Sequence, residues 1–350
     1  MPEHAIDILI RGAGPVGCAL ALALRDSPFT VRILGRSESH PAFRPLALSY
    51  ASRLILERLG AWRGLQVTPI ERIRVSQQHG FGRMVMDAAD AGVPALGYVI
   101  EYAALLGRLH QECAALFLEK ETSARCVVHA EGTAAAGHEK RFAQDAVVAL
   151  VRTEPDSITT AFERFTAEGP LALLPHQGRY AVIWSCRPER ALTLAECPER
   201  NFLQELCVAA GRRPGRPITV EHRALQPLAR RVRPARIGTR EVYIGNAAQT
   251  LHPVAGQGLN LGLRDAWDLS SVFLESPDPG DARTLQRYAA NRRLDTQATI
   301  RLTDALAGAF VGSNRLLRGA RGIALSALDV LPAPRRFFAR RMIYGSSALP

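Results

Sequence analysis

Three glycines near the amino terminus constrain the fold more than any other feature of this sequence. Gly12, Gly14 and Gly17 form a GxGxxG pattern between an apolar, strand-like run and an alanine- and leucine-rich run at 15–25. In a strand–turn–helix unit the first glycine permits a tight turn, the second lets a pyrophosphate approach the backbone, and the third lets helix and strand pack closely. With a further apolar run at 30–34, the segment predicts a nucleotide site at the amino terminus of a helix.

A second glycine-rich turn lies in the segment IGNAAQTLHPVAGQGLNLGLRD, residues 244–265. An apolar strand ends at Gly245, a polar loop follows, and Gly256 and Gly258 lead into a helix that begins near Leu259. Glycines allow a ligand to approach the backbone closely, and the N–H groups at a helix start attract anions and dipoles. The segment therefore predicts a second ligand-binding turn.

The rest of the chain divides into strand-like and helical stretches. A long helix is expected at 101–120, and the stretch 145–184 contains several strand-like runs separated by proline, glycine and charged turns. This pattern favours an antiparallel sheet. From Gly258 onward the spacing of apolar residues is mainly helical. We therefore expect the chain to cross more than once between a nucleotide-binding part and a strand-rich part.

Several motifs, in order along nearly the whole chain, resemble the FAD-dependent aromatic hydroxylases. The segment 244–265 is similar to their flavin-contacting motif. Its residues most resemble the UbiH/VisC-type branch of ubiquinone biosynthesis, the 2-polyprenyl-6-methoxyphenol hydroxylases. The stretches AFERFTAEGPLALLP (161–175), LGYVIE (96–101) and RRLDTQATIRLTDALAGAF resemble the same branch. The resemblance implies an α/β fold, α+β overall, with a Rossmann-like FAD-binding domain, an antiparallel-sheet substrate domain and C-terminal helices.

The resemblance also implies where the domains lie. We expect a discontinuous FAD-binding domain at 1–66, 97–150 and 238–312, a substrate-binding sheet domain at 67–96 and 151–237, and a helical tail at 313–350.

The activity implied by the resemblance is that of an FAD-dependent monooxygenase that hydroxylates a polyprenylated phenol. In that family NAD(P)H reduces FAD, the reduced flavin adds O2 to form a C4a-hydroperoxide, and this species hydroxylates the phenol; the cofactor carries the chemistry. The alternative is a degenerate, non-catalytic subunit of a ubiquinone-synthesis complex.

The resemblance assigns individual residues to the cofactor. Pro253 is expected beside the flavin ring, Asn246 near the ribityl chain, and the backbone of 258–260 at the pyrimidine edge. His252 and Arg44 are candidates to assist catalysis, with a packed loop histidine and a surface arginine as the alternatives. The full set expected at the cofactor is Gly12, Gly14, Pro15, Gly17, Arg36, Arg44, Glu131, Gly245, Asn246, Pro253, Gly256, Gly258, Leu259 and Asn260.

Two positions depart from the family pattern. Gly35 stands where a carboxylate would bind the ribose, and Arg36 follows it. This combination indicates either a 2'-phosphate site or an FAD site without its ribose clamp. In a third motif, Glu131 replaces the usual aspartate, and Ala135 and His138 take the serine and arginine places, within a shortened connection.

Composition narrows the remaining function classes. The formal net charge is +11, yet no nucleic-acid recognition motif is present, and the six cysteines form no CxxC pair, so we expect neither nucleic acid nor a metal. No apolar run approaches the roughly 18 residues of a membrane-spanning helix, and the first residues lack a signal-peptide pattern. We expect a cytoplasmic protein. Arginines among apolar residues near the C-terminus predict peripheral contact with the inner face of the cytoplasmic membrane, a solvated helical tail being the alternative.

Overall fold

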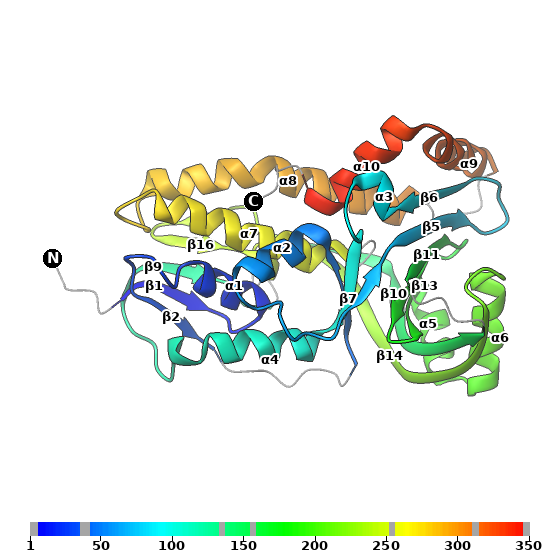
Figure 1. Cartoon of the computed structure of the whole chain (residues 1–350), viewed down its shortest axis with the longest axis horizontal. Helices are drawn as coiled ribbons and strands as arrows, with labels where there is room; N and C mark the ends of the chain where they lie inside the picture. The colour runs from blue at the N-terminus through cyan, green and yellow to red at the C-terminus, as the bar shows by residue number, and fades with distance from the viewer. Residues whose placement is uncertain are drawn as a thin grey trace.

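The computed structural model describes residues 6–35, 43–132, 137–154, 159–251, 256–309 and 315–345. Its described part contains three sheets. The nucleotide-type sheet lies at one end of an elongated molecule, the small sheet containing β7 lies in the middle, and the large sheet lies at the other end (Figure 1).

The six-stranded sheet has the order β15–β16–β9–β1–β2–β8. Its central strand β1 (Ile6–Arg11) pairs in parallel with β2 (Val31–Leu34) and with β9 (Ala124–His129). Ile8, Leu9 and Ile10 are all buried, as expected of a parallel strand covered on both faces. The remaining strands are β8 (Phe117–Leu118), β15 (Ile237–Gly238) and β16 (Glu241–Tyr243).

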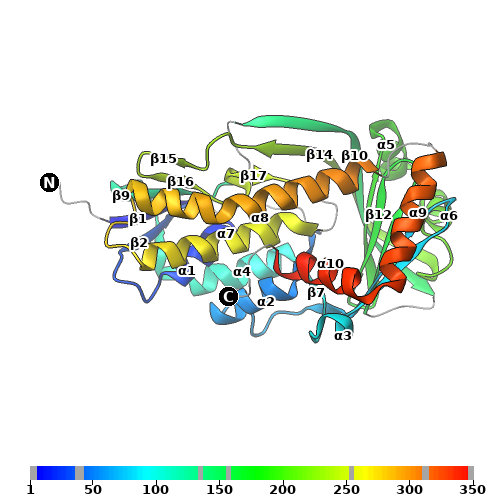
Figure 2. The same ribbon diagram turned by 90° about the horizontal axis from the view of Figure 1, so that it is seen from above.

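In the described part of the chain, five helices share one hydrophobic core with this sheet. They are α1 (Pro15–Ala23), α2 (Tyr50–Arg58), α4 (Tyr102–Glu112), α7 (Gln257–Leu274) and α8 (Ala282–Ala309). Helices α7 and α8 run side by side along the molecule (Figure 2). The chain therefore returns, more than 200 residues after α1, to complete the core that α1 began.

The eight-stranded sheet is mostly antiparallel, and helices α5 (Pro188–Glu196) and α6 (Glu199–Ala210) cover one of its faces. Strand β11 pairs in parallel with β5, which joins an early segment of the chain to the later strands. In sheet order the strands are β17 (Gln249–Thr250), β14 (Arg216–Val232), β10 (His138–Glu154), β13 (Arg179–Cys186), β12 (Pro170–His176), β11 (Thr160–Phe165), β5 (Arg72–Gln77) and β6 (Arg83–Asp87).

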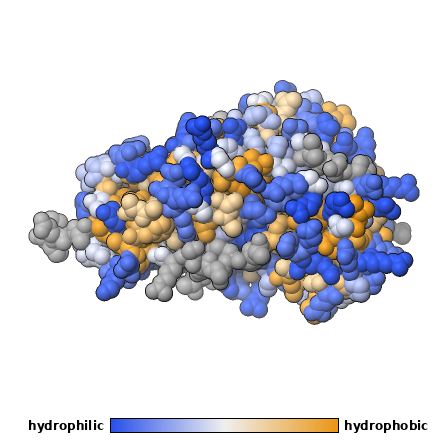
Figure 3. Space-filling view, turned by 60° about the horizontal axis from the view of Figure 1, so that its bottom comes forward, coloured by the Kyte–Doolittle hydropathy of each residue, from blue (hydrophilic) through white to orange (hydrophobic). Residues whose placement is uncertain are grey.

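The three-stranded antiparallel sheet comprises β3 (Pro45–Ser49), β7 (Gly97–Glu101) and β4 (Thr68–Ile70). Residues of β5, β6, α9 and α10 form a further core cluster with residues of α2. The remaining elements are α3 (Ala88–Ala91), η1 (Ala114–Leu116), η2 (Gly245–Ala247), α9 (Arg315–Val330) and α10 (Pro332–Tyr344). Hydrophilic side chains cover much of the face shown in Figure 3, with smaller hydrophobic patches between them.

The predicted fold class is confirmed: a parallel Rossmann-like sheet, an antiparallel-sheet unit and C-terminal helices are all present. Strand β10 pairs with β13 and β14, so residues 138–150 lie in the eight-stranded sheet, and the domain bounds given above stay a prediction. One element boundary needs correction. The helix expected at 101–120 ends at Glu112. The chain then turns through η1 into β8, whose pairing with β2 outweighs the local helical pattern.

Candidate functional site

The first glycine turn follows β1 and is packed so closely that two of its three glycines leave no space for a side chain. A Cβ at Gly12 would lie 2.6 Å from the backbone of Ala130, and one at Gly17 would overlap the carbonyl oxygen of Gly12. At Gly14, in contrast, a Cβ would meet no atom of the described residues within 4 Å. The first and third glycines thus serve packing, whereas the second borders open space.

That open space lies at the amino terminus of α1. Gly14 is the N-cap and Pro15 occupies the first turn, and no side chain among the described residues caps the helix. The first N–H groups of an α-helix have no partner within the helix, and they carry the positive end of its dipole. The turn therefore has the chemistry of a phosphate site.

Gly35 lies against the same turn. A Cβ built on it would come 2.9 Å from the backbone nitrogen of Ala13, and its φ is +158°. Gly35 therefore lacks the expected carboxylate, and its backbone also lies close to the turn. Any side chain at this position would require the turn to shift. Arg36, the other residue predicted here, lies outside the described residues.

Glu131 follows β9 at the opposite side of the first turn. Its backbone nitrogen would lie 2.8 Å from a Cβ at Gly12. Its exposed carboxylate Oε1 is 3.4 Å from His129 Nδ1, and the His129 ring stacks on Tyr243. The tertiary structure thus brings Glu131 beside the first glycine, as its predicted role requires. His138 begins β10, and Ala135 lies outside the described residues.

The second predicted turn packs directly on the first helix. Gly245 has a φ of +57°, and a Cβ there would lie 3.1 Å from Val16 of α1. A Cβ at Gly262, on α7, would lie 2.6 Å from the same valine side chain. Asn246 follows Gly245 in η2. Because Gly245 and Gly262 have no side chains, α1, η2 and α7 can pack closely. Of these two glycines, the sequence analysis singled out only Gly245.

The start of α7 is held by one buried amide. The Asn260 Oδ1 accepts hydrogen bonds from Ser49 N at 2.8 Å and Ser52 Oγ at 2.7 Å. Its Nδ2 donates to the carbonyl oxygens of Ala47 at 3.0 Å and Gly256 at 2.7 Å. The side chain predicted at the cofactor therefore ties the first turn of α7 to β3 and α2, which leaves its backbone as the group available to a ligand.

The neighbouring positions complete this turn. Gly256, with a φ of +60°, is the N-cap of α7, and in the part of the chain that the structure describes a Cβ at Gly258 would meet no atom within 4 Å. Leu259 is half-buried and packs against the core of the parallel sheet. His252 and Pro253, the predicted catalytic helper and ring contact, lie outside the described residues.

Arg44 lies at the entry to β3, at the junction between the sheets. Its guanidinium stands 4.5 Å from the centre of the Tyr102 ring, and its carbonyl oxygen accepts a hydrogen bond from Tyr102 N at 2.9 Å. The residue is exposed. This placement connects β3 to α4, and any contact with a bound ring remains a prediction.

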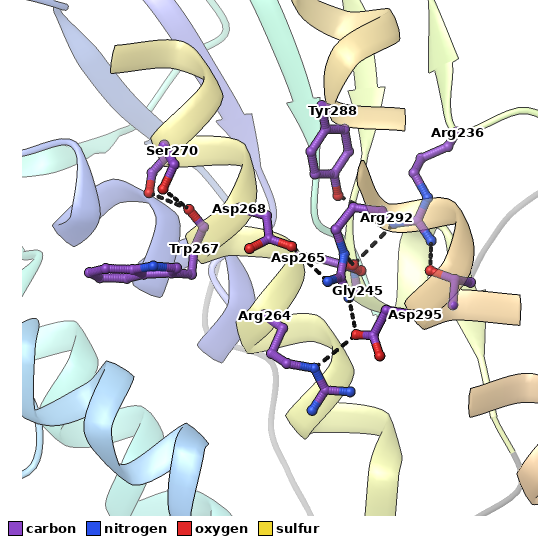
Figure 4. Close-up of polar contacts among 12 residues, drawn as sticks. Arg236, Gly245, Arg264, Asp265, Trp267, Asp268, Ser270, Tyr288, Arg292 and Asp295 are labelled. Carbon is purple, nitrogen blue, oxygen red and sulfur yellow. Dashed lines mark hydrogen bonds and ion pairs between the residues drawn. The ribbon is translucent and has the colours of Figure 1, made fainter. Parts of the chain in front are cut away.

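A buried charge network beneath the second turn was not predicted from the sequence. Asp265, on α7, is fully buried (Figure 4). Its Oδ2 accepts hydrogen bonds from Gly245 N at 3.1 Å and Gln249 Nε2 at 2.8 Å. Its Oδ1 lies 2.8 Å from Arg292 Nε and 3.1 Å from Arg236 Nη1. Asp265 therefore fixes the glycine turn to α7 and α8 by its side chain.

Arg292 of α8 is the centre of this network. Its other two nitrogens lie 2.7 Å from Asp268 and 2.9 Å from Asp295, and Asp295 is also 2.9 Å from Arg264 Nε. Burial raises the pKa of a carboxyl group, but Arg236 and Arg292 hold the pKa of Asp265 below its usual range. The spacing of Arg292 and Asp295 by three residues was the available sequence signal.

The arrangement fits the phosphates of a dinucleotide. Val16, at the start of α1, packs against Gly245 and Gly262, and among the residues that the structure describes nothing fills the space beside Gly14 and Gly258. FAD contains such a pyrophosphate. In the described part of the chain, no cluster of histidine, cysteine, aspartate and glutamate residues could hold a metal ion. None of the helices described is long and apolar enough to cross a membrane.

Known structures share this fold. The chain superposes on p-nitrophenol 4-monooxygenase PnpA from Pseudomonas putida with a TM-score of 0.78 and 15% identity, covering 98% of this chain and 99% of that one. It superposes on Klebsiella pneumoniae R204Q HpxO complexed with FAD with a TM-score of 0.76 and 14% identity, covering 97% and 99%.

Sequence relatives cover most of the chain as well. It is 28% identical to the 3-demethoxyubiquinol 3-hydroxylase of Escherichia coli, over 94% of this chain and 96% of the relative. It is also 28% identical to the ubiquinone hydroxylase UbiL of Rhodospirillum rubrum, over 97% and 89%. The model of the FAD binding domain family matches residues 118–303. That match spans more than half of the sequence, and the chain therefore belongs to the FAD-binding domain family of flavoprotein hydroxylases.

Proposed function

We propose that this protein is an FAD-dependent monooxygenase that hydroxylates a polyprenylated phenol, of the 2-polyprenyl-6-methoxyphenol type, in ubiquinone biosynthesis. The observation that carries the proposal is full-length similarity: two relatives named for hydroxylation of ubiquinone or its precursors align over 94% and 97% of the chain. The converging glycine turns supply the site that such an enzyme needs for its cofactor.

The chain's own residues would hold FAD at both turns. The N–H groups at the start of α1, beside Gly14, would bind the pyrophosphate, with Glu131 at the other side of the turn. The backbone of 258–260 would hold the edge of the ring, because Asn260 fixes that turn to β3. When bound, FAD supplies the redox chemistry: it takes electrons from NAD(P)H and activates O2 for transfer of one oxygen atom to the substrate ring.

The eight-stranded sheet would provide the substrate side of the site. Its face opposite α5 and α6 carries the half-buried apolar residues Val148, Ala172, Leu174 and Ile183. Apolar residues that are not fully covered suit a hydrophobic substrate and exclude water from the reacting ring.

The C-terminal helices support contact with an anionic membrane surface, which is where a polyprenylated substrate resides. Ile323, Val330, Leu331 and Phe337 are exposed apolar residues of α9, α10 and their connection. Arginines at 336 and 340 are exposed beside them. Exposed apolar residues next to cationic ones are typical of surfaces that dock on anionic headgroups.

The direct test supplies the FAD-loaded protein with NADH or NADPH, O2 and a polyprenyl phenol. The expected result is a product that is heavier by one oxygen atom and takes up label from isotopic O2. Expression of the chain should also restore ubiquinone in a bacterial strain lacking the corresponding hydroxylase. A yellow protein that forms no product and fails to complement would favour the non-catalytic alternative.

A further inference from the structure

One face of the eight-stranded sheet carries an acidic residue among apolar ones. Glu163, in the middle of β11, pairs with Ala172 of β12 and with Val75 of β5. Residues paired across neighbouring strands point to the same face. Ala172 pairs in turn with Ile183 of β13, so these four residues form a row across the sheet. The residues next to Glu163 along β11 point to the opposite face, where Phe162 joins the core under α5 and α6.

This face continues toward the predicted flavin turn. Ala161, two residues before Glu163, packs with Ile70 and Val99 of the three-stranded sheet, and Leu174 joins the same cluster. The third strand of that sheet, β3, is bonded to Asn260 at the start of α7. The row containing Glu163 and the turn at 256–260 are thus joined by one small sheet.

Glu163 lacks the partner that a buried carboxylate ordinarily has. Its Oε1 is shielded from solvent and has no hydrogen-bond partner among the residues that the structure describes. Arg164 points to the other face, where its guanidinium borders Gly211. An unpaired buried acceptor destabilises the folded state, so its presence calls for an explanation.

The charged groups packed around this edge of the sheet are engaged elsewhere. Arg335 of α10 pairs with Asp90 of α3 at 3.3 Å, and Arg83 of β6 lies 4.0 Å from Asp329 of α9. Tyr50 of α2 and Tyr344 of α10 pack against the adjoining apolar cluster. Burial raises the pKa of Glu163 to about 7, and no charged neighbour contributes to that shift. The carboxyl group is therefore available to a ligand.

We propose that Glu163 accepts the hydrogen bond of the substrate's phenolic hydroxyl and then its proton. This inference rests on the proposed function. The O–H bond of the phenol breaks, its electron pair stays on the phenolic oxygen, and the proton moves to a carboxylate oxygen of Glu163. The phenolate ring is more electron-rich at the carbons ortho and para to the oxygen, which favours transfer of an oxygen atom to them. Half-buried Ala172 and Ile183 would contact the ring beside the carboxylate.

An equilibrium measurement tests the contact without requiring turnover. The probe is 4-methylphenol, whose hydroxyl titrates like that of tyrosine at about pH 10, so it is neutral between pH 6 and pH 8. Its Kd for the FAD-loaded wild type, Glu163→Gln and Glu168→Gln is measured by calorimetry at both pH values. Glu168 is the matched control, because its carboxylate belongs to the same hairpin and pairs with Arg187 at 3.2 Å.

The wild type and Glu168→Gln should bind more tightly at pH 8, where Glu163 is ionised, than at pH 6. Glu163→Gln should show no such dependence and bind about 10-fold more weakly than the wild type at pH 8, as expected for a lost charge-assisted hydrogen bond. Equal Kd values for wild type and Glu163→Gln at both pH values would overturn the proposal, as would failure of the FAD-loaded wild type to bind 4-methylphenol.

Turnover provides the second readout. With a polyprenyl phenol, Glu163→Gln should lower kcat about 100-fold, with a smaller change in KM, and should remove the rise in rate through about pH 7. Glu163→Asp should retain that rise. An unchanged kcat in Glu163→Gln would refute the proton-transfer step while leaving the hydroxylase function intact. Absence of hydroxylation by the wild type would refute the proposed function, and the binding measurement would still decide the phenol contact.

Discussion

Replacing Gly14 with valine should weaken FAD binding strongly while leaving the fold intact. Gly14 has a φ of −75° and a ψ of 174°, which a valine adopts without strain, and a Cβ there meets none of the described atoms within 4 Å. The side chain would instead occupy the space bordering the start of α1. If the pyrophosphate loses two charge-assisted hydrogen bonds, each worth about 1.5–3 kcal/mol, the affinity for FAD should fall about 10²- to 10⁴-fold.

The cost to the apoprotein should be small. Valine is a poorer N-cap than glycine, so the free energy of unfolding should fall by about 1 kcal/mol. FAD dissociation is measured by flavin fluorescence and unfolding by urea denaturation. Gly107→Val is the matched control, since Gly107 is an exposed glycine on α4 whose Cβ would also meet no atom. Gly17→Val should differ from both by failing to fold, because its Cβ would overlap the backbone of Gly12.

Wild-type FAD affinity in Gly14→Val would refute the reasoning, because the pyrophosphate then cannot lie over this turn. Loss of folding in the same variant would equally contradict the open space found beside Gly14.

Four further predictions concern other parts of the molecule. Arg292→Met should lower the free energy of unfolding by about 3–5 kcal/mol in urea denaturation, because it leaves buried Asp265 and Asp295 short of a partner. Since the folded-state pKa of Asp265 is lowered, its contribution to stability should be present above the unfolded value of about 3.9 and be lost as the pH falls below it. Gly35→Glu should not tighten FAD binding in fluorescence titrations, because its Cβ would press on the backbone of Ala13; a gain in affinity would show that the turn can shift. Serine at both Val330 and Phe337 should weaken binding to anionic liposomes at low salt about 10-fold, whereas serine at Leu294, equally exposed on α8, should have no effect.

Local sequence patterns predicted the elements that carry the cofactor turns. The GxGxxG pattern with its flanking apolar runs gave β1, α1 and β2, and the glycines at 256 and 258 marked the start of α7. These signals are reliable because backbone conformation and helix starts depend on neighbouring residues, as the N-cap position of Gly14 illustrates. The domain bounds stay a prediction, and the sheet that residues 138–150 join was not predicted, because an alternating apolar run such as β10 does not reveal which sheet it joins.

By itself, the sequence determined a nucleotide-binding strand–turn–helix unit, a second glycine turn and a strand-rich middle. Only the tertiary structure decided which distant residues meet. Gly245 and Gly262 pack against Val16, and Asp265 is buried against Arg292. Glu163, whose Oε1 has no partner among the described residues, lies on an apolar face that is not fully covered. The physical reason is that burial, ion pairing and close backbone approach depend on contacts between residues tens to hundreds of positions apart, which no local pattern records.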